Sequence, residues 1–344
     1  MLPIEGDLTP EQVQAAQQTF NDYIESKNID LRKVERQTGR SAHSIALWRR
    51  DKWTGNVDRL TREMMVWVEQ HAKGESSGMP KGFITTTITE RMFGVLSATR
   101  KRRIVSLITG PAGVSKTVMC KAAATGLFPG AVHIECRQGT SSARSFAQLW
   151  ARKLDVRTTG SLGSIEDAII RRLANSDRLQ LIDEAQYLKA GALNIVRDVH
   201  KQADAPIALV GTRDVEMAVD DRRQFYGQWT RLIGHRYDIS EAQEMDGEPL
   251  FTVDEIHRFA ASMELKLTGD GAETATEIAC LPGEGGLGML AMYLLNADIF
   301  CQRAGRRSIN KGDIIGAYQA LQGERHFQRY EVERRALVER VKVA

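Results

Sequence analysis

A glycine-rich segment in the first half of the chain restricts the possible folds more than any other feature. It reads GPAGVSKT from Gly110 to Thr117, follows the apolar run RIVSLIT (103–109) and precedes the helical run TVMCKAAATGLF. A strand, a glycine-rich loop and a helix in this order are the context that a phosphate-binding loop requires. Such a loop surrounds phosphate with backbone N–H groups, and the following helix adds the positive end of its dipole. The segment therefore predicts an α/β fold that binds a nucleotide.

The residues of this segment, called the phosphate loop below, are our candidates for contact with ATP. They are Gly110, Pro111, Ala112, Gly113, Val114, Ser115, Lys116 and Thr117. In a loop of this kind Lys116 supplies a charge to the β- and γ-phosphates, and Thr117 offers its hydroxyl to Mg²⁺. The sixth position of the pattern GxxxxGK(S/T) holds Ser115 instead of glycine, which adds a side chain where the backbone lies close to phosphate. This departure predicts either weaker nucleotide binding or a tighter fit.

A second motif, LQLID (179–183) followed by Glu184, is an apolar strand that ends in two carboxylates. Asp183 suits a contact with the Mg²⁺ ion or its water, and Glu184 suits the base that polarises water for attack on the γ-phosphate. The next apolar run, PIALVG (206–211), ends at Thr212, whose hydroxyl would help to orient that water. Strands often end in charged residues, so this motif gains its weight from the phosphate loop upstream. Together the two motifs predict a Mg²⁺-dependent ATPase.

Composition and charge exclude several other classes of protein. Hydrophobic residues make up 42% of the 344 residues and charged residues 26%, which is typical of folded domains. The four cysteines are far apart and form no CxxC pair, so we expect neither a disulfide framework nor a zinc site. No apolar run is long enough for a membrane span, and the N-terminus lacks a signal sequence. We therefore expect a cytoplasmic protein without a membrane partner.

Changes of pattern along the chain predict how it divides. We expect a helical DNA-binding domain at 1–72, a linker at 73–82, an α/β core at 83–244, a small helical domain at 245–321 and a charged helical tail at 322–344. Thr9, Pro10 and Gln12 predict the start of the first helix. Further apolar runs, AVHIEC (131–136) and HRYDI (235–239), predict strands in the core. Strands that alternate with helices indicate a parallel sheet covered by helices.

Residues 31–50 predict two short helices joined by a tight turn, which is the arrangement of a helix-turn-helix. Gly39 would end the first helix, Ser41 would cap the second, and Ile45 and Trp48 would pack inward. The polar and basic side chains left on the other side, or just beyond this helix, are candidates for DNA contact: His43, Ser44, Arg49, Arg50 and Lys52. Such cations contact phosphates and carry little sequence information. A protein–protein role for this helical domain is the alternative.

Taken in order, GPAGVSKT, LQLIDEAQYL and PIALVGT resemble the motifs of AAA+ ATPases. The segment RMFGVLSATRKRR and the helical C-terminal part resemble one branch, the transposition ATPases related to the phage Mu B protein, TnsC, TniB and IstB. LRKVERQTGRSAHSIALWRRDKW resembles the helix-turn-helix that precedes the ATPase in that branch. The resemblance implies an AAA+ P-loop ATPase with a parallel sheet flanked by helices, a small all-α lid, and an all-α N-terminal domain.

The resemblance also implies a function. It implies slow ATP hydrolysis stimulated by DNA and a transposase, and a helical filament of copies of this chain on duplex DNA, bound largely without sequence preference. Basic and polar side chains of the core are candidates to face that DNA: Arg137, Arg144, Lys153, Arg157, Thr158, Arg171 and Arg172. Arg231, with Arg236 as the alternative, is the candidate cation that reaches a neighbouring subunit's nucleotide. Gly288 stands where the family has an arginine, which leaves one cation fewer in the lid.

Two other functions remain compatible with the sequence. A helicase loader has a similar AAA+ core, but it would bind a hexameric helicase and prefer single-stranded DNA. A transcription regulator would depend on the helix-turn-helix and carry a weak ATPase, which Ser115 and Gly288 would allow. Of the three, the motifs favour an ATP-dependent regulator of DNA transposition that assembles on target duplex DNA, recruits the transposase and disassembles on ATP hydrolysis.

Overall fold

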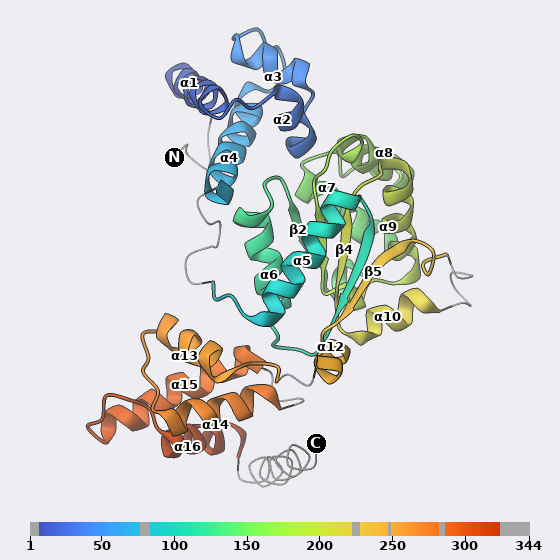
Figure 1. Cartoon of the computed structure of the whole chain (residues 1–344). Coiled ribbons are helices and arrows are strands. Elements are labelled where there is room, and N and C mark those ends of the chain that lie inside the picture. The colour runs from blue at the N-terminus through green and yellow to red at the C-terminus, as the bar shows by residue number, and fades with distance from the viewer. Residues whose placement is uncertain (1–6, 76–82, 222–227, 247–248, 282–285, 324–344) are drawn as a thin grey trace. The chain divides into compact units, whose positions relative to one another are not determined.

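The computed structural model of the chain describes residues 7–75, 83–221, 228–246, 249–281 and 286–323 (Figure 1). The chain forms two compact units, which we describe separately. The first contains residues 1–81, 93–108 and 117–237, and the second contains 82–92, 109–116 and 238–344. Within the described residues, no helix is both long and apolar enough to cross a membrane. The expected charged tail lies outside the described residues from 324 onward, as does the expected linker from 76 to 82.

A five-stranded sheet forms the centre of the first unit. Its strands are β1 (Val105–Thr109), β2 (Val132–Glu135), β3 (Gln180–Asp183), β4 (Ile207–Gly211) and β5 (Ile233–Asp238). They lie in the order β2-β3-β4-β1-β5, and the β2–β3 and β3–β4 pairs are parallel. Four of the runs that predicted strands contain one, and the fifth, HRYDI (235–239), overlaps β5, which begins two residues earlier, so the predicted strands are confirmed. Because the carboxyl ends of parallel strands meet at one edge, the ends of β2, β3 and β4 lie at the same edge of the sheet.

Helices flank this sheet (Figure 1). They are α5 (Thr87–Arg102), α6 (Lys116–Ala122), α7 (Ala143–Leu154), α8 (Leu162–Leu173), α9 (Ala190–Ala203) and α10 (Arg213–Asp220). Phe146 and Trp150 of α7 are fully buried against the sheet, with ring centroids 5.5 Å apart. Trp150 Nε1 donates to Gln180 Oε1 at 2.9 Å, which satisfies the indole N–H inside the core. The predicted parallel sheet flanked by helices is confirmed.

The N-terminal helices pack around a small aromatic core. They are α1 (Pro10–Ser26), α2 (Leu31–Thr38), α3 (Ala42–Arg49) and α4 (Val57–Glu75). Phe20, Trp48 and Trp67 are buried here, and the ring centroids of Phe20 and Trp48 lie 5.4 Å apart. Trp48 Nε1 donates to Thr61 Oγ1 at 2.9 Å. The predicted inward packing of Ile45 and Trp48 is confirmed, because both side chains have no exposed area.

Local sequence signals define the ends of these helices. Thr9 Oγ1 accepts from Gln12 N at 3.3 Å, and Gln12 Oε1 accepts from Thr9 N at 2.9 Å. Ser41 Oγ accepts from Ser44 N at 3.1 Å, and Gly39 ends α2 in the left-handed region with φ 67°. The predicted caps are therefore confirmed. A short turn joins α2 to α3, as a helix-turn-helix requires, and a DNA-binding role for this pair stays a prediction.

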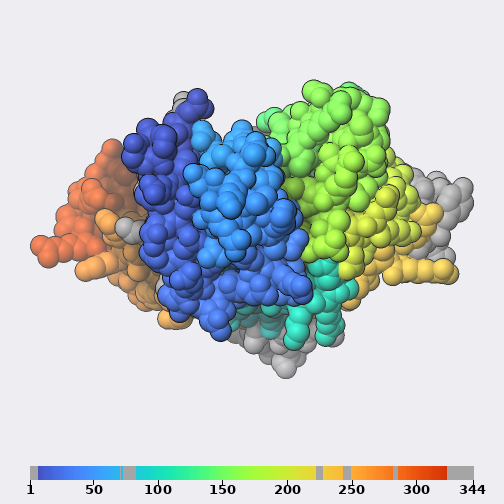
Figure 2. Space-filling model, turned by 90° about the horizontal axis from the view of Figure 1, so that it is seen from above, coloured from blue at the N-terminus to red at the C-terminus, as the bar shows by residue number. Residues whose placement is uncertain are grey.

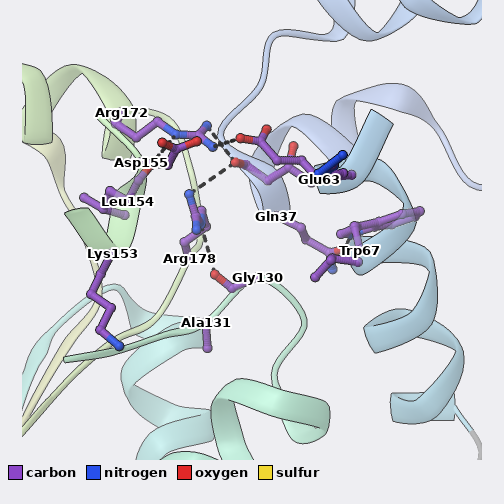
Figure 3. Close-up of a pocket in the computed structure, with 13 residues that line it drawn as sticks. Gln37, Glu63, Trp67, Gly130, Ala131, Lys153, Leu154, Asp155, Arg172 and Arg178 are labelled. Atoms are coloured by element: carbon purple, nitrogen blue, oxygen red, sulfur yellow. Dashed lines mark hydrogen bonds and ion pairs between the residues drawn. The ribbon is translucent and has the colours of Figure 1, made fainter. Parts of the chain in front are cut away.

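Within the first unit, the N-terminal helices contact the segments that lead into β2 and β3. Figure 2 shows the N-terminal helices in blue beside the α7–α8 region in green. Arg178, two residues before β3, donates from Nε to Gly130 O at 2.9 Å and from Nη1 to Thr38 O at 3.3 Å (Figure 3). The N–H of Asp177 donates to Arg36 O at 2.8 Å. The last turn of α2 is thus hydrogen-bonded to the segment that leads into β3.

A charge cluster lies beside these hydrogen bonds (Figure 3). Glu63 of α4 accepts from Arg40 at 2.6 and 2.7 Å, and Glu63 Oε1 lies 3.6 Å from Arg172 Nη2. Arg172 also donates from Nη1 to Thr38 O at 2.8 Å. Gly39 is required here, because a Cβ atom at this position would lie 2.7 Å from Arg172 O. Arg172, expected from the sequence to face DNA, is instead 9% exposed within this contact.

Glu63 gives this contact a pH dependence. Burial raises its pKa, but the hydrogen bonds from Arg40 and the charges of Arg172 and Arg40 outweigh that effect, so the pKa of Glu63 lies below the ordinary glutamate value. Because the folded pKa is lower than the unfolded one, the ionised Glu63 stabilises the fold above the unfolded pKa, about 4.3. This stabilisation is lost as the pH falls through the lower folded value.

Replacing Glu63 with glutamine is expected to lower the free energy of unfolding at pH 7 by about 1–3 kcal/mol. The figure is smaller than for a fully buried pair, about 3–5 kcal/mol, because the Glu63 side chain is 22% exposed. Urea unfolding at a series of pH values measures the effect, and the difference from the parent chain should shrink below about pH 4.3. Glu25→Gln is the control, since Glu25 is 73% exposed and lies 3.5 Å from Arg49. Equal effects of the two variants would contradict the prediction.

The second unit is built from helices and the phosphate loop. Its helices are α12 (Ile239–Asp246), α13 (Val253–Ser262), α14 (Gly269–Cys280), α15 (Gly286–Arg303) and α16 (Lys311–Gln322), together with the first turns of α5. Buried Glu255 of α13 accepts from the N–H of Thr87 at 2.6 Å and from its hydroxyl at 3.0 Å, which fixes the start of α5. The predicted all-α character of this C-terminal part is confirmed for the described residues. Its domain limits stay a prediction.

Candidate functional site

The phosphate loop turns through two left-handed residues. Gly113 has φ 80° and Ser115 has φ 68°. The second value explains why this position is glycine in the general pattern, since a left-handed residue with a side chain costs about 1–2 kcal/mol. Ser115 therefore keeps the backbone conformation of the pattern, with its N–H in place, and adds strain to the loop.

Lys116 lies at the centre of the phosphate loop. Its Nζ atom donates to Gly110 O at 2.8 Å and to Pro111 O at 2.6 Å, and the residue is 7% exposed. An ammonium group held on neutral carbonyl oxygens forms stronger, charge-assisted hydrogen bonds when phosphate oxygens replace them. The loop therefore fits a polyphosphate ligand.

The start of α15 lies directly on the phosphate loop, inside the second unit. Leu287 N donates to Gly113 O at 3.1 Å, and Gly286 has φ 54°. A Cβ atom at position 286 would lie 2.7 Å from Gly113 O, so glycine is required at this approach. Gly288, where the family has an arginine, is exposed, and a Cβ atom there would meet no other atom within 4 Å. The sequence predicted a lid here, and its hydrogen bond to the loop could not be derived from spacing.

Asp183 lies at the carboxyl end of β3 and has no exposed area. Its Oδ1 atom accepts from Glu184 N at 3.0 Å, and its Oδ2 atom lies 3.1 Å from His133 Nε2 on β2. Thr117 is the second residue of α6 and the first residue of this helix that belongs to the first unit. It is half-buried. A hydroxyl and a carboxylate are oxygen donors of the kind that Mg²⁺ prefers, so the donor set of Thr117 and Asp183 fits that ion.

Glu184 is held by a residue that the sequence analysis did not select. Glu184 adopts a left-handed conformation with φ 54°, and Gln186 Nε2 donates to its carboxylate. The other end of the same amide, Gln186 Oε1, accepts from Thr212 N at 3.2 Å. Gln186 thus connects the candidate base to the end of β4. The hydroxyl of Thr212 donates to Asp214 at 3.2 Å.

The two candidate arginines of the first unit differ in their surroundings. Arg236 pairs with Glu216 at 3.0 Å and with Asp220 at 2.7 Å, so α10 holds it within the same chain. Arg231 is exposed and forms no ion pair with the residues that the structure describes. This difference favours Arg231 as the cation available to a neighbouring copy.

The candidate DNA contacts are mostly at the surface. His43, Arg50 and Lys52 are exposed, Ser44 is half-buried, and Arg49 donates to Asn21. Five of the basic candidates in the core are exposed, namely Arg137, Arg144, Lys153, Arg157 and Arg171, and Thr158 is half-buried. Exposure is compatible with DNA contact and equally with a solvated surface, so these residues stay predictions.

The sheet order, the phosphate loop and the acidic end of β3 define the class of this protein. A family model described as an AAA domain matches residues 99–219, so this part of the chain has the AAA+ fold with a P-loop. Within that class it resembles the phage Mu B type. It is 21% identical over 229 residues to the "ATP-dependent target DNA activator B" of Escherichia phage Mu, covering 65% of this chain and 72% of that one.

Two further comparisons accompany this match. The "Mu-like prophage FluMu DNA transposition protein B" of Haemophilus influenzae is 19% identical over 219 residues, covering 62% of this chain and 76% of that one. Among solved structures, the ORC2 protein of Aeropyrum pernix, in complexes with ADPNP and ADP, has a TM-score of 0.49 at 14% identity. That likeness covers 67% of this chain and 66% of the other.

Proposed function

We propose that this chain is an ATP-dependent regulator of DNA transposition. Copies of the chain bind ATP at the phosphate loop, assemble as a filament on target duplex DNA and recruit a transposase. Hydrolysis of ATP then drives disassembly. The observation that carries the proposal is the phosphate loop, with Lys116 buried on the carbonyl groups of Gly110 and Pro111, in an AAA+ protein similar to the target DNA activator B of phage Mu.

The residues of the proposed site have separate roles. Lys116 Nζ exchanges its two carbonyl partners for phosphate oxygens, which are stronger acceptors because they are charged. Thr117 and Asp183 are the residues that would hold Mg²⁺, which neutralises phosphate charge when it is bound with the nucleotide. Glu184 accepts a proton from the attacking water, and Gln186 holds its carboxylate in place.

The proposed dependence of assembly on ATP follows from the thermodynamic linkage between nucleotide binding and assembly. A nucleotide that binds the assembled state more tightly than the separate chain shifts the equilibrium toward assembly. Arg231 supplies the cation that reaches the nucleotide of the next copy and stabilises negative charge in the transition state. Partners of this kind, namely duplex DNA, a transposase and further copies, place the chain in the cytoplasm of a bacterial or phage-infected cell.

Electron microscopy tests the proposal directly. The purified chain is mixed with plasmid duplex DNA, with and without a non-hydrolysable ATP analogue. Filaments on the DNA are expected only with the analogue. A discrete footprint without ATP dependence would instead indicate a transcription regulator, and a preference for single-stranded DNA would indicate a helicase loader; either result overturns the proposal.

Removing two exposed cations after α3 is expected to reduce the salt dependence of DNA binding. Each cation that neutralises a phosphate of duplex DNA adds about 0.9 to the slope of log K against log salt, so the double variant Arg50→Ala/Lys52→Ala should lower that slope by about 2. Fluorescence anisotropy with labelled duplex at several salt concentrations measures it. Lys27→Ala, an exposed cation at the end of α1, is the control. An unchanged slope would place DNA elsewhere on the molecule.

A further inference from the structure

We propose that Cys120, His133 and Asp183 form a binding site for a transition-metal ion of the zinc type. One ligand atom from each residue, the Cys120 thiol sulfur, a His133 ring nitrogen and an Asp183 carboxylate oxygen, lies within 4.8 Å of the other two. His133 Nε2 and Asp183 Oδ2 are already 3.1 Å apart. These three residue types are zinc ligands in proteins.

The fold brings these residues together from three elements. Cys120 lies on α6, which follows the phosphate loop, while His133 lies on β2 and Asp183 on β3. In the parallel register His133 is paired with Leu181, and Leu181 and Asp183 are two residues apart on β3. Side chains two apart on a strand share a face, so His133 and Asp183 lie on the same face of the sheet. Because the ligands are spread over residues 120–183, the spacing of the cysteines along the chain does not indicate the site.

The distances suit a tetrahedral ion. Zinc bonds of about 2.0–2.3 Å place the ligand atoms of a tetrahedron about 3.3–3.8 Å apart, so the three groups need to shift by on the order of 1 Å or less. Three protein ligands leave a fourth position for water, as in open zinc sites. A thiolate and an imidazole favour Zn²⁺ over Mg²⁺, which keeps to oxygen ligands.

Burial also suits an ion held by this set. Cys120 and Asp183 have no exposed area, and the His133 side chain is 13% exposed, so His133 marks the side from which an ion reaches the cluster. Binding forms bonds from the metal to Sγ, to the ring nitrogen and to a carboxylate oxygen. The thiol of Cys120 loses its proton to solvent, and the His133–Asp183 hydrogen bond is replaced. Affinity should therefore rise with pH.

The site shares Asp183 with the proposed ATPase. An ion held by Cys120 and His133 draws the Asp183 carboxylate away from nucleotide-bound Mg²⁺, so zinc should slow ATP turnover. This consequence rests on the proposed function, whereas binding of the metal does not. Asp183 would thus belong both to the proposed ATPase site and to a site that binds transition metals.

Titration of the full chain with Co²⁺, without nucleotide, tests the site. Cobalt bound to a thiolate absorbs in the near ultraviolet, and a charge-transfer band that saturates at one equivalent is expected. Cys120→Ser should abolish the band. His133→Gln, which keeps a hydrogen-bond donor for Asp183, should weaken binding by more than the roughly 10- to 100-fold that loss of an outer-shell partner of a metal ligand causes, because it removes a direct ligand. Thermal unfolding of each variant checks that it is folded.

Cys136 provides the matched control. Its N–H donates to Asp183 O at 2.9 Å, and it is buried at the end of β2. Burial, with the negative charges of Asp183 and Glu184, raises the pKa of Cys136 to about 12. Cys136 is not one of the three residues whose ligand atoms lie within 4.8 Å of one another. Cys136→Ser should keep the cobalt band. No band in the parent chain, or an unchanged band in folded Cys120→Ser, overturns the proposal.

A second measurement separates this proposal from the proposed function. ATP turnover is followed with excess Mg²⁺ at rising Zn²⁺ concentration, in the parent chain and in Cys120→Ser. Zinc should inhibit the parent at least 10-fold more strongly than the variant. Equal inhibition of the parent chain and of Cys120→Ser by zinc would show that metal bound at this site does not draw Asp183 away from the nucleotide. Absence of turnover under every condition would count against the ATPase, while the cobalt titration would still decide the metal site.

Discussion

Replacing Lys116 with alanine is expected to lower the affinity for ATP by about 100-fold and to abolish ATP-dependent assembly on duplex DNA. The ammonium group makes two hydrogen bonds within the phosphate loop and would make charged ones to phosphate, each worth about 1.5–3 kcal/mol. Losing about 2.7 kcal/mol corresponds to about 100-fold in the binding constant. Isothermal titration calorimetry with a non-hydrolysable analogue measures the affinity, and sedimentation with plasmid DNA measures assembly.

Lys121→Ala is the matched control for this experiment. Lys121 lies on the same helix, α6, but its side chain is 56% exposed and its Nζ atom lies 3.6 Å from Glu135. This variant should bind ATP as the parent chain does. If Lys116→Ala kept full affinity, the phosphate loop would not be the nucleotide site and the proposed mechanism would be wrong.

Glu184→Gln is expected to reduce the rate of ATP hydrolysis by about 100- to 10,000-fold while leaving ATP binding intact, because general-base catalysis contributes a factor of this size. The amide keeps the shape of the side chain but cannot accept the proton from water. Phosphate release under saturating ATP measures turnover, and filaments formed with ATP should persist in this variant. Filaments that disassembled as fast as those of the parent would contradict the assignment of the base.

Glu135→Gln separates this effect from a general loss of negative charge. Glu135 ends β2 and is the register partner of Asp183, so it lies at the same edge of the sheet, but it is exposed. Its replacement removes one charge near the site without removing the candidate base. Turnover in this variant should stay close to that of the parent chain.

Most of the fold could be predicted because its signals are local. Runs of five to seven residues identified every strand of the sheet, from Val105–Thr109 to Ile233–Asp238. Short polar signals identified helix ends, as at Thr9 and Ser41, since a cap forms between residues three apart. The pattern of the phosphate loop even indicated which position is unusual, and Ser115 indeed has a positive φ.

The contacts that could not be predicted join distant parts of the chain. Nothing in the spacing of residues indicates that Gln186 holds Glu184, or that His133 lies 3.1 Å from Asp183. The same holds for Arg172, whose sequence context on a helix suits a surface cation. Tertiary packing on Thr38 and Glu63 decides its environment instead. Roles that depend on such contacts require the folded chain.

The docking of the N-terminal helices has a mechanical consequence. Arg178 is hydrogen-bonded to Thr38, the last residue of α2, and five residues later the same stretch of chain reaches Asp183. β3 itself is four residues long, a stiff rod of about 13 Å between these two points. A force that a long, curved or stretched polymer exerts on α3 would therefore be transmitted along β3 over this short distance. It would change the position of the Asp183 carboxylate at the other end of the strand.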